Sequence, residues 1–170
     1  MTDLEISQKA KESKIKVMIV DDQAIIREGL GYLLNGFEAV EVIAQASNGA
    51  DAIKFSQEYL PDVILMDIRM PGISGVEATK IIKGKQSEIK IIIFTTFDDD
   101  EYIIEAMSGG ASGYLLKDTD SKSLVQAIKN VFAGNIIMPG AVFSKLTGNL
   151  NQHNKGKLKT PADNIEMDDF

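Results

Sequence analysis

The sequence has no cysteine and only one histidine, His153, among its 170 residues. With no thiolate and almost no imidazole, the chain offers few ligands for zinc or other soft transition metals. It also lacks an apolar run approaching the roughly 18 residues that a bilayer-spanning helix needs, and it has no basic segment leading into an apolar stretch. These absences predict a soluble, cytoplasmic protein with no membrane partner.

Positive charge is scarce as well. The chain has 18 Lys and Arg residues against 25 Asp and Glu residues, which gives a formal net charge of -7. Nucleic acids and anionic membranes are bound through clustered Lys and Arg, so this balance argues against direct DNA binding. Hydrophobic residues make up 44% of the sequence, enough for one compact domain with tails.

Short β-branched apolar runs alternate with longer segments whose apolar residues recur at helical spacing. The predicted strands are 17–20, 40–46, 63–66, 89–94 and 114–116. The predicted helices are 24–34, 49–58, 75–83, 101–107 and 121–132. Several strands are apolar at nearly every position, as expected of parallel strands covered on both faces. We therefore predict a doubly wound α/β fold of the flavodoxin type, with a five-stranded parallel sheet in the order 2-1-3-4-5.

The two ends of the chain differ in composition from the middle. Residues 1–14 are polar and mixed in charge, which predicts a flexible tail. Residues 15–134 carry the alternating pattern and form the predicted domain. Residues 145–170 are rich in Asn, Lys, Gly and Asp, and residues 135–170 are predicted to be a linker or disordered segment with no helix-turn-helix pattern.

Acidic residues stand where predicted strands end. Asp21 and Asp22 directly follow the first strand, and Asp67 directly follows the third. The carboxyl ends of parallel strands meet at one edge of a sheet, so the three carboxylates are expected to converge. Two unit charges 4 Å apart repel by about 4 kcal/mol at an effective dielectric near 20, and a bound cation offsets that repulsion. Oxygen ligands of this kind suit Mg²⁺.

A hydroxyl and an ammonium group join the same edge, since Thr95 lies at the carboxyl end of the fourth predicted strand, directly after residue 94, and Lys117 follows the fifth. Taken singly, each of these residues has an ordinary explanation: a carboxylate after a strand commonly caps a helix, and a lysine commonly lies on the surface. Chance would rarely place all of these residues together at the ends of four strands. It favours a site at which Lys117 and Thr95 bind an anionic phosphoryl group.

Four stretches together resemble the receiver domain of two-component response regulators, over roughly residues 15–133. They are Val-Asp-Asp at 20–22, Met-Asp-Ile-Arg-Met-Pro-Gly at 66–72, Phe-Thr-Thr-Phe at 94–97 and Gly-Tyr-Leu-Leu-Lys-Asp at 113–118. The last stretch and the acidic run at 97–102 resemble the NarL and LuxR subgroup. The resemblance implies the CheY-like version of the predicted fold.

The resemblance also implies a role for each matching residue. Asp67 is the expected phosphoryl acceptor, and Thr95 and Lys117 bind the transferred group. Thr95 and Tyr114 form the expected switch, and Mg²⁺ is held by Asp21, Asp22, Asp67 and the main-chain carbonyl of Arg69. The expected donor is a sensor histidine kinase, and the expected output is homodimerisation and transcription regulation. DNA would be reached only through a domain that this chain does not contain, and the chain would not be an enzyme beyond its own phosphorylation chemistry.

Three departures from the common family pattern stand out. Asp118 follows Lys117 where many receivers have proline, and Thr96 stands where many have alanine. Arg69 and Phe97 lie two residues beyond Asp67 and Thr95, and we expect these bulky side chains to restrict attacking water and prolong the phosphorylated state.

Other functional classes compete with the receiver-domain interpretation. A small Mg²⁺-dependent phosphohydrolase would ordinarily carry a second aspartate where Arg69 stands. A flavodoxin-like cofactor binder would want a phosphate-cradling loop where Asp21 and Asp22 stand. A stand-alone receiver that acts as an interaction module, or a truncated regulator, would each fit a chain that ends at Phe170.

Overall fold

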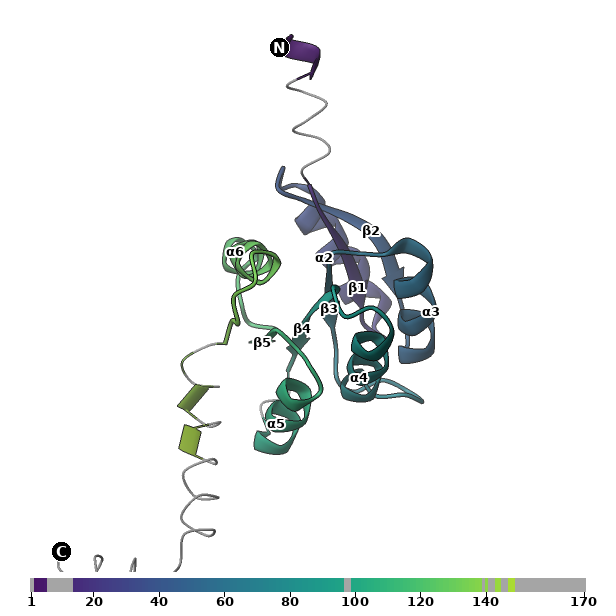
Figure 1. Ribbon diagram of the computed structural model, residues 1–170, viewed down its shortest axis with the longest axis vertical. Coiled ribbons are helices and arrows are strands. Elements are labelled where there is room, and N and C mark those ends of the chain that lie inside the picture. Colours follow the sequence, from purple (N-terminus) through teal and green to yellow (C-terminus); the bar gives the residue numbers. More distant parts are fainter. Residues whose placement is uncertain are drawn as a thin grey trace, which may run out of the picture.

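The computed structural model describes residues 2–5, 14–96 and 99–138, together with residues 140, 143, 144, 147 and 148. Strands and helices alternate along the described chain (Figure 1). The strands are β1 (Ile15–Val20), β2 (Val40–Ala46), β3 (Val63–Met66), β4 (Lys90–Thr95) and β5 (Gly113–Leu116). The helices are α2 (Ala24–Asn35), α3 (Gly49–Tyr59), α4 (Gly75–Lys85), α5 (Asp100–Ser108) and α6 (Ser121–Phe132). Each predicted element is present, with its ends shifted by two residues or fewer.

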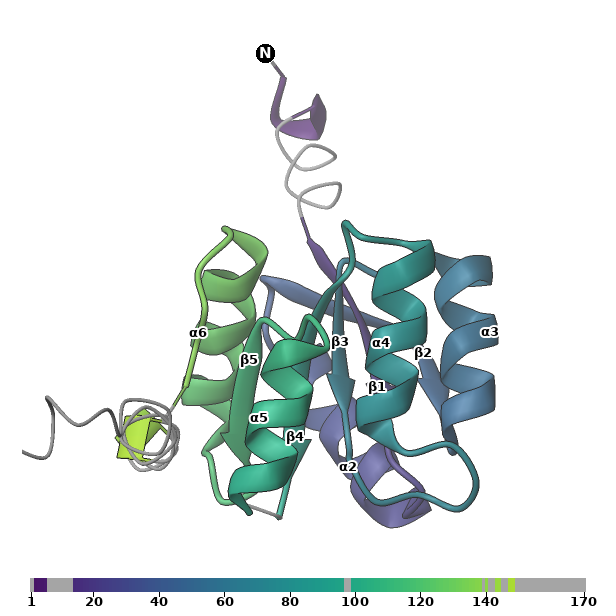
Figure 2. The ribbon, with the colours of Figure 1, turned by 60° about the horizontal axis from the view of Figure 1, so that its bottom comes forward.

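The five strands form one parallel sheet in the order β2-β1-β3-β4-β5, which confirms the predicted fold. Figure 2 shows α3, α4 and α5 side by side over one face of the sheet. Their apolar residues pack into one core with Met18, Ile64 and Ile91, whereas α2 and α6 pack on the other face into a second core. Two covered faces explain why β3 is buried at every position.

Polar side chains fix where several helices begin. Asn48 accepts a hydrogen bond from the Asp51 amide at 2.7 Å, and Asp120 accepts one from the Ser123 amide at 2.8 Å. These N-caps satisfy backbone donors that have no partner inside the helix. The Asp120 bond lies at the same sheet edge as the predicted site and sets the start of α6, which follows β5. Hydrogen bonds from Ser123 hold the pKa of the Asp120 carboxyl below its usual value.

Beyond α6 the chain returns to the outer edge of β5. The Ile137 amide donates to the Ser112 carbonyl at 3.0 Å, and the Tyr114 amide donates to the Ile137 carbonyl at 3.0 Å. Met138 then packs against the core on the α5 side. Ordered packing therefore continues past the domain end predicted at residue 134, because the edge of β5 offers backbone groups that a short extended segment can pair.

Much of the predicted tails, including His153, lies outside the described residues. Among the described residues, no helix has the length and apolar character that crossing a bilayer requires.

Candidate functional site

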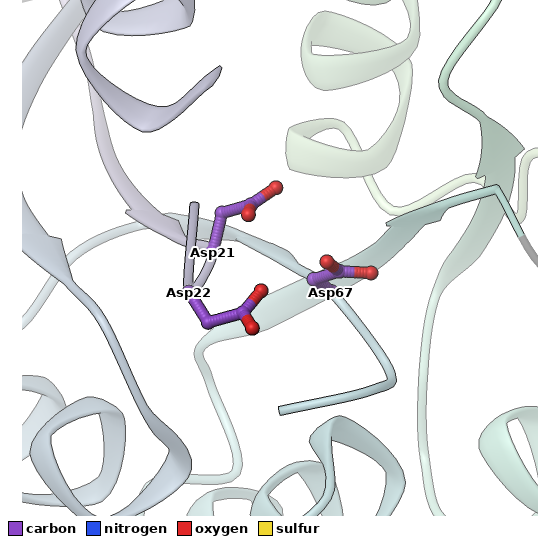
Figure 3. A group of neighbouring side chains, drawn as sticks. All are labelled: Asp21, Asp22 and Asp67. Carbon is purple, nitrogen blue, oxygen red and sulfur yellow. The ribbon is translucent and has the colours of Figure 1, made fainter. Parts of the chain in front are cut away.

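Three carboxylates meet at the carboxyl edge of the sheet, as the sequence predicted. Asp21 and Asp22 follow β1 and Asp67 follows β3, and these strands are neighbours in which Val20 pairs with Met66. One carboxylate oxygen from each of the three aspartates lies within 4.8 Å of the others (Figure 3). Asp21 and Asp67 are 3% and 6% exposed, whereas Asp22 is open to solvent.

Backbone hydrogen bonds hold the two buried aspartates in place. The Asp67 amide donates to the Val20 carbonyl at 3.0 Å, which extends the pairing of β3 with β1 by one residue. The Oδ1 of Asp67 accepts from the Ile68 amide at 2.9 Å, and the Oδ1 of Asp21 accepts from the Gln23 amide at 2.9 Å. In each carboxylate one oxygen is thus fixed by a nearby amide.

The loop after Asp67 is closed by a glycine. The Gly75 amide donates to the Ile68 carbonyl at 2.8 Å, where α4 begins. A Cβ atom at Gly75 would lie 1.8 Å from the main-chain oxygen of Asp67, well inside van der Waals contact. Only glycine permits this approach, so the start of α4 positions the backbone of Asp67.

Lys117 binds both buried carboxylates from the end of β5. Its Nζ lies 2.6 Å from Asp21 Oδ2 and 3.0 Å from Asp67 Oδ2. Burial by itself would lower the pKa of Lys117, but the hydrogen bonds and charges of the two carboxylates outweigh it and raise the pKa above its usual value. Lys117 is therefore a cation at neutral pH, fixed against the oxygen predicted to react.

Thr95 and Tyr114 are both buried on neighbouring strands, β4 and β5. Thr95 is fully buried at the end of β4, and its main-chain carbonyl accepts a hydrogen bond from the Lys117 amide at 2.9 Å. Tyr114 is fully buried in β5, within the core that faces α3, α4 and α5. An ordinary aromatic core residue would be buried in the same way, so the switch role of Tyr114 stays a prediction.

Arg69 and Tyr102 form a contact that sequence reasoning missed. The Nη2 of Arg69 donates to the Tyr102 hydroxyl at 3.2 Å, and the guanidinium carbon lies 5.7 Å from the centre of the Tyr102 ring. The two residues are 33 positions apart, and no local spacing links them. The predicted role of the Arg69 carbonyl as a metal ligand stays a prediction, and Phe97, predicted to flank the phosphoryl group, lies outside the described residues.

The donor set fits a hard divalent cation. Its three clustered side chains offer oxygen atoms alone, which Mg²⁺ prefers. Three carboxylates and one ammonium group leave a formal charge of -2, which one divalent cation would neutralise. The exposed carboxylate of Asp22 gives such an ion a route from solvent.

Comparison with known proteins gives one consistent family. The model of the response regulator receiver domain matches residues 17–129. The chain is 42% identical over 152 residues to the transcriptional regulatory protein LnrK of Bacillus subtilis, covering 89% of this chain and 68% of LnrK. It is 43% identical over 121 residues to the oxygen regulatory protein NreC of Staphylococcus aureus, covering 71% of this chain and 56% of NreC.

Solved structures agree. A LuxR-family two-component response regulator from Aurantimonas has a TM-score of 0.76 at 34% identity, with 81% of this chain and 98% of that chain covered. The receiver domain of the NarL response regulator from Mycobacterium tuberculosis has a TM-score of 0.69 at 30% identity, with 72% and 99% covered.

Proposed function

The chain belongs to the response regulator receiver domain family, and from that premise we propose that Asp67 accepts a phosphoryl group in an Mg²⁺-dependent reaction. The observation that carries the proposal is the position of Asp67 Oδ2, which lies 3.0 Å from the Lys117 ammonium and beside two further carboxylates. A buried carboxylate next to a fixed cation and a metal-binding group is suited to phosphoryl transfer, which needs positioning and charge neutralisation more than covalent help.

The proposed donor is a phosphohistidine on a sensor histidine kinase. The Asp67 oxygen forms a bond to phosphorus, the phosphorus–nitrogen bond of the donor breaks, and the departing imidazole takes up a proton. Mg²⁺, when bound, neutralises charge on the phosphoryl oxygens. Asp21 and Asp22 would hold this ion together with Asp67 and the Arg69 carbonyl.

Lys117 has two successive partners in this scheme. At rest it binds Asp67 and Asp21, which keeps the reacting oxygen aimed at the edge of the sheet. After transfer, the same ammonium group would bind a phosphoryl oxygen, because charge-assisted hydrogen bonds to phosphate are strong. The Thr95 hydroxyl, at the end of the neighbouring strand, would donate to a second phosphoryl oxygen.

Phosphorylation would act as a switch by shifting an existing equilibrium. The phosphoryl group carries about -1.5 to -2 charge at pH 7 and provides three strong acceptors. Any state in which Thr95 and Lys117 bind it better gains population at the expense of the other state. We propose that Tyr114 reports this change, in concert with α5.

Homodimerisation is the proposed output, and the surface of the described residues favours one face for it. Ile25, Tyr32 and Leu33 lie on α2 and are 83%, 85% and 54% exposed, which forms an apolar stripe along that helix. The outer edge of β5, by contrast, is already paired with Ile137. These two features together favour the α2 face over strand pairing through β5.

The function of the longer regulator is a further proposal. This chain spans 68% of LnrK and 56% of NreC, so transcription regulation and DNA binding would belong to the longer protein. For this chain we propose no catalysis beyond phosphorylation and dephosphorylation of Asp67.

The decisive experiment is intact-mass analysis after incubation with a small phosphodonor and Mg²⁺. Wild type should gain one phosphoryl mass, and Asp67→Asn should gain none. Asp118→Asn serves as the matched control, since Asp118 is an exposed carboxylate next to Lys117. An equal gain in wild type and Asp67→Asn would move the acceptor elsewhere and overturn the proposal.

A further inference from the structure

Arg69 connects the loop after β3 to helix α5. Its guanidinium donates to the Tyr102 hydroxyl at 3.2 Å and also lies over the Tyr102 ring, 5.7 Å from its centre. A hydrogen bond and a cation–π contact to one partner fix both the end and the face of that ring. The loop that carries Asp67 is thereby bridged to a helix 33 residues further along the chain.

Helix α5 has two fully buried residues among those that pack on the core. Of its nine residues only Ile103 and Ala106 are buried, whereas α4 buries five of its eleven residues. Tyr102 is partly buried against the edge of the core. Both fully buried residues of α5 lie beyond Tyr102 in the chain, so the bridge to Arg69 is a contact that helps to set the position of the first turn of α5.

The bridge borders the acidic site. Arg69 and Tyr102 line a hollow of about 430 Å³ together with Asp22, whose carboxylate belongs to the cluster with Asp67. Arg69 therefore borders the same hollow as Asp22, one of the three clustered carboxylates. The chain's other arginine, Arg27, donates to the main-chain carbonyl of Asp21 at 2.8 Å and lies on α2, on the opposite side of the sheet from α5.

The change in net charge on phosphorylation favours a change of partner for Arg69. The three carboxylates, Lys117 and one divalent cation together have no formal charge. A phosphoryl group of about -1.5 to -2 in place of one carboxylate leaves the site negative. A planar guanidinium binds phosphate oxygens through two parallel hydrogen bonds, which are stronger than a bond to a neutral phenol.

We propose that Arg69 has two positions: it is held by Tyr102 at rest, and it is drawn onto the phosphoryl oxygens once Asp67 is modified, which releases the first turn of α5. This inference rests on the proposed function and names the contact through which the acceptor site reaches α5. Arg69 is then a positioning residue for the switch, and Tyr102 is its resting partner.

Hydrogen exchange of the full chain, followed by mass spectrometry of peptides from α5, tests the two halves separately. Without phosphodonor, Tyr102→Phe and Arg69→Met should each raise exchange across Asp100–Ser108 about threefold or more, because each removes part of the bridge. The matched controls are Tyr32→Phe and Lys122→Met, which alter exposed residues of α2 and α6. These should leave α5 unchanged.

With phosphodonor and Mg²⁺, wild-type α5 should exchange faster, while Tyr102→Phe, in which the bridge is already weakened, should show a smaller further change although its intact mass still rises. Resting exchange equal to wild type in both bridge variants would overturn the inference, and so would an α5 response to phosphorylation in Tyr102→Phe as large as in wild type. If wild type gains no mass, the proposed function fails and the phosphoryl-driven half of the inference fails with it, while resting exchange still decides whether the bridge holds α5.

Discussion

Lys117 Nζ lies 3.0 Å from Asp67 Oδ2, although the two residues are 50 positions apart in the chain. The same ammonium group binds Asp21 Oδ2 at 2.6 Å, so one cation serves two buried carboxylates. Neither aspartate could be buried beside the other at such low exposure without a compensating charge. The contact thus stabilises the resting site and places the proposed reacting oxygen next to its proposed phosphoryl ligand.

Removing that cation should separate metal binding from phosphorylation. In Lys117→Met the site keeps three carboxylates and loses its ammonium group, so Mg²⁺ should bind about tenfold more tightly, a gain of about 1.4 kcal/mol. Phosphorylation should nevertheless fall by about a hundredfold or more, because no ammonium group meets the phosphoryl oxygens. Mg²⁺ titration and intact mass measure the two effects. Weaker Mg²⁺ binding in the variant would contradict the charge argument.

The raised pKa of Lys117 predicts how stability depends on pH. A group whose pKa is higher in the folded state stabilises the fold below its unfolded value of 10.5, and this stability is lost as pH rises through the folded pKa. Urea unfolding between about pH 9 and pH 12 should therefore show a loss of stability above pH 10.5 that is smaller in Lys117→Met. Subtracting the pH profile of Lys117→Met from that of wild type cancels the contribution of the other lysines, which both proteins share. Identical pH profiles would exclude the linkage.

Gly75 should tolerate no side chain. In Gly75→Ala the new Cβ would overlap the Asp67 carbonyl, at 1.8 Å, so we expect a loss of about 3 kcal/mol in unfolding free energy and a strong loss of phosphorylation. Gly84→Ala is the matched control in the same helix, because its Cβ would meet nothing within 4 Å. That control should gain up to about 1 kcal/mol from helix propensity. Equal stability of the two variants would refute the close approach.

The apolar stripe on α2 predicts where dimers form. Tyr32→Glu places a charge within the stripe of Ile25, Tyr32 and Leu33, so the phosphorylated protein should stay monomeric in sedimentation velocity while its intact mass still rises. Glu41→Lys on β2 is a charge-changing control away from the stripe. Undiminished dimerisation of Tyr32→Glu would shift the interface to another face.

Much of this protein followed from local pattern. The alternation of apolar runs with helical spacing predicted all five strands, and the fully apolar run at β3 predicted a strand covered on both faces. Asp21, Asp22 and Asp67 could be grouped from sequence because strands of a parallel sheet end at one edge, and the structure brings them within 4.8 Å. Periodicity and strand direction are local properties, so sequence reports them well.

Contacts between side chains from distant elements were decided only by the fold. Nothing in the spacing of Arg69 and Tyr102 predicts their bridge, since it depends on how α5 sits beside the loop after β3. The return of Ile137 to β5 was likewise missed, because this short apolar segment was assigned to the predicted linker. Its two hydrogen bonds exist only when an unpaired strand edge lies within reach. The sequence by itself determined which residues stand at the ends of strands. Tertiary packing decided which of their side chains touch, because contact energies depend on three-dimensional distance and orientation and not on position along the chain.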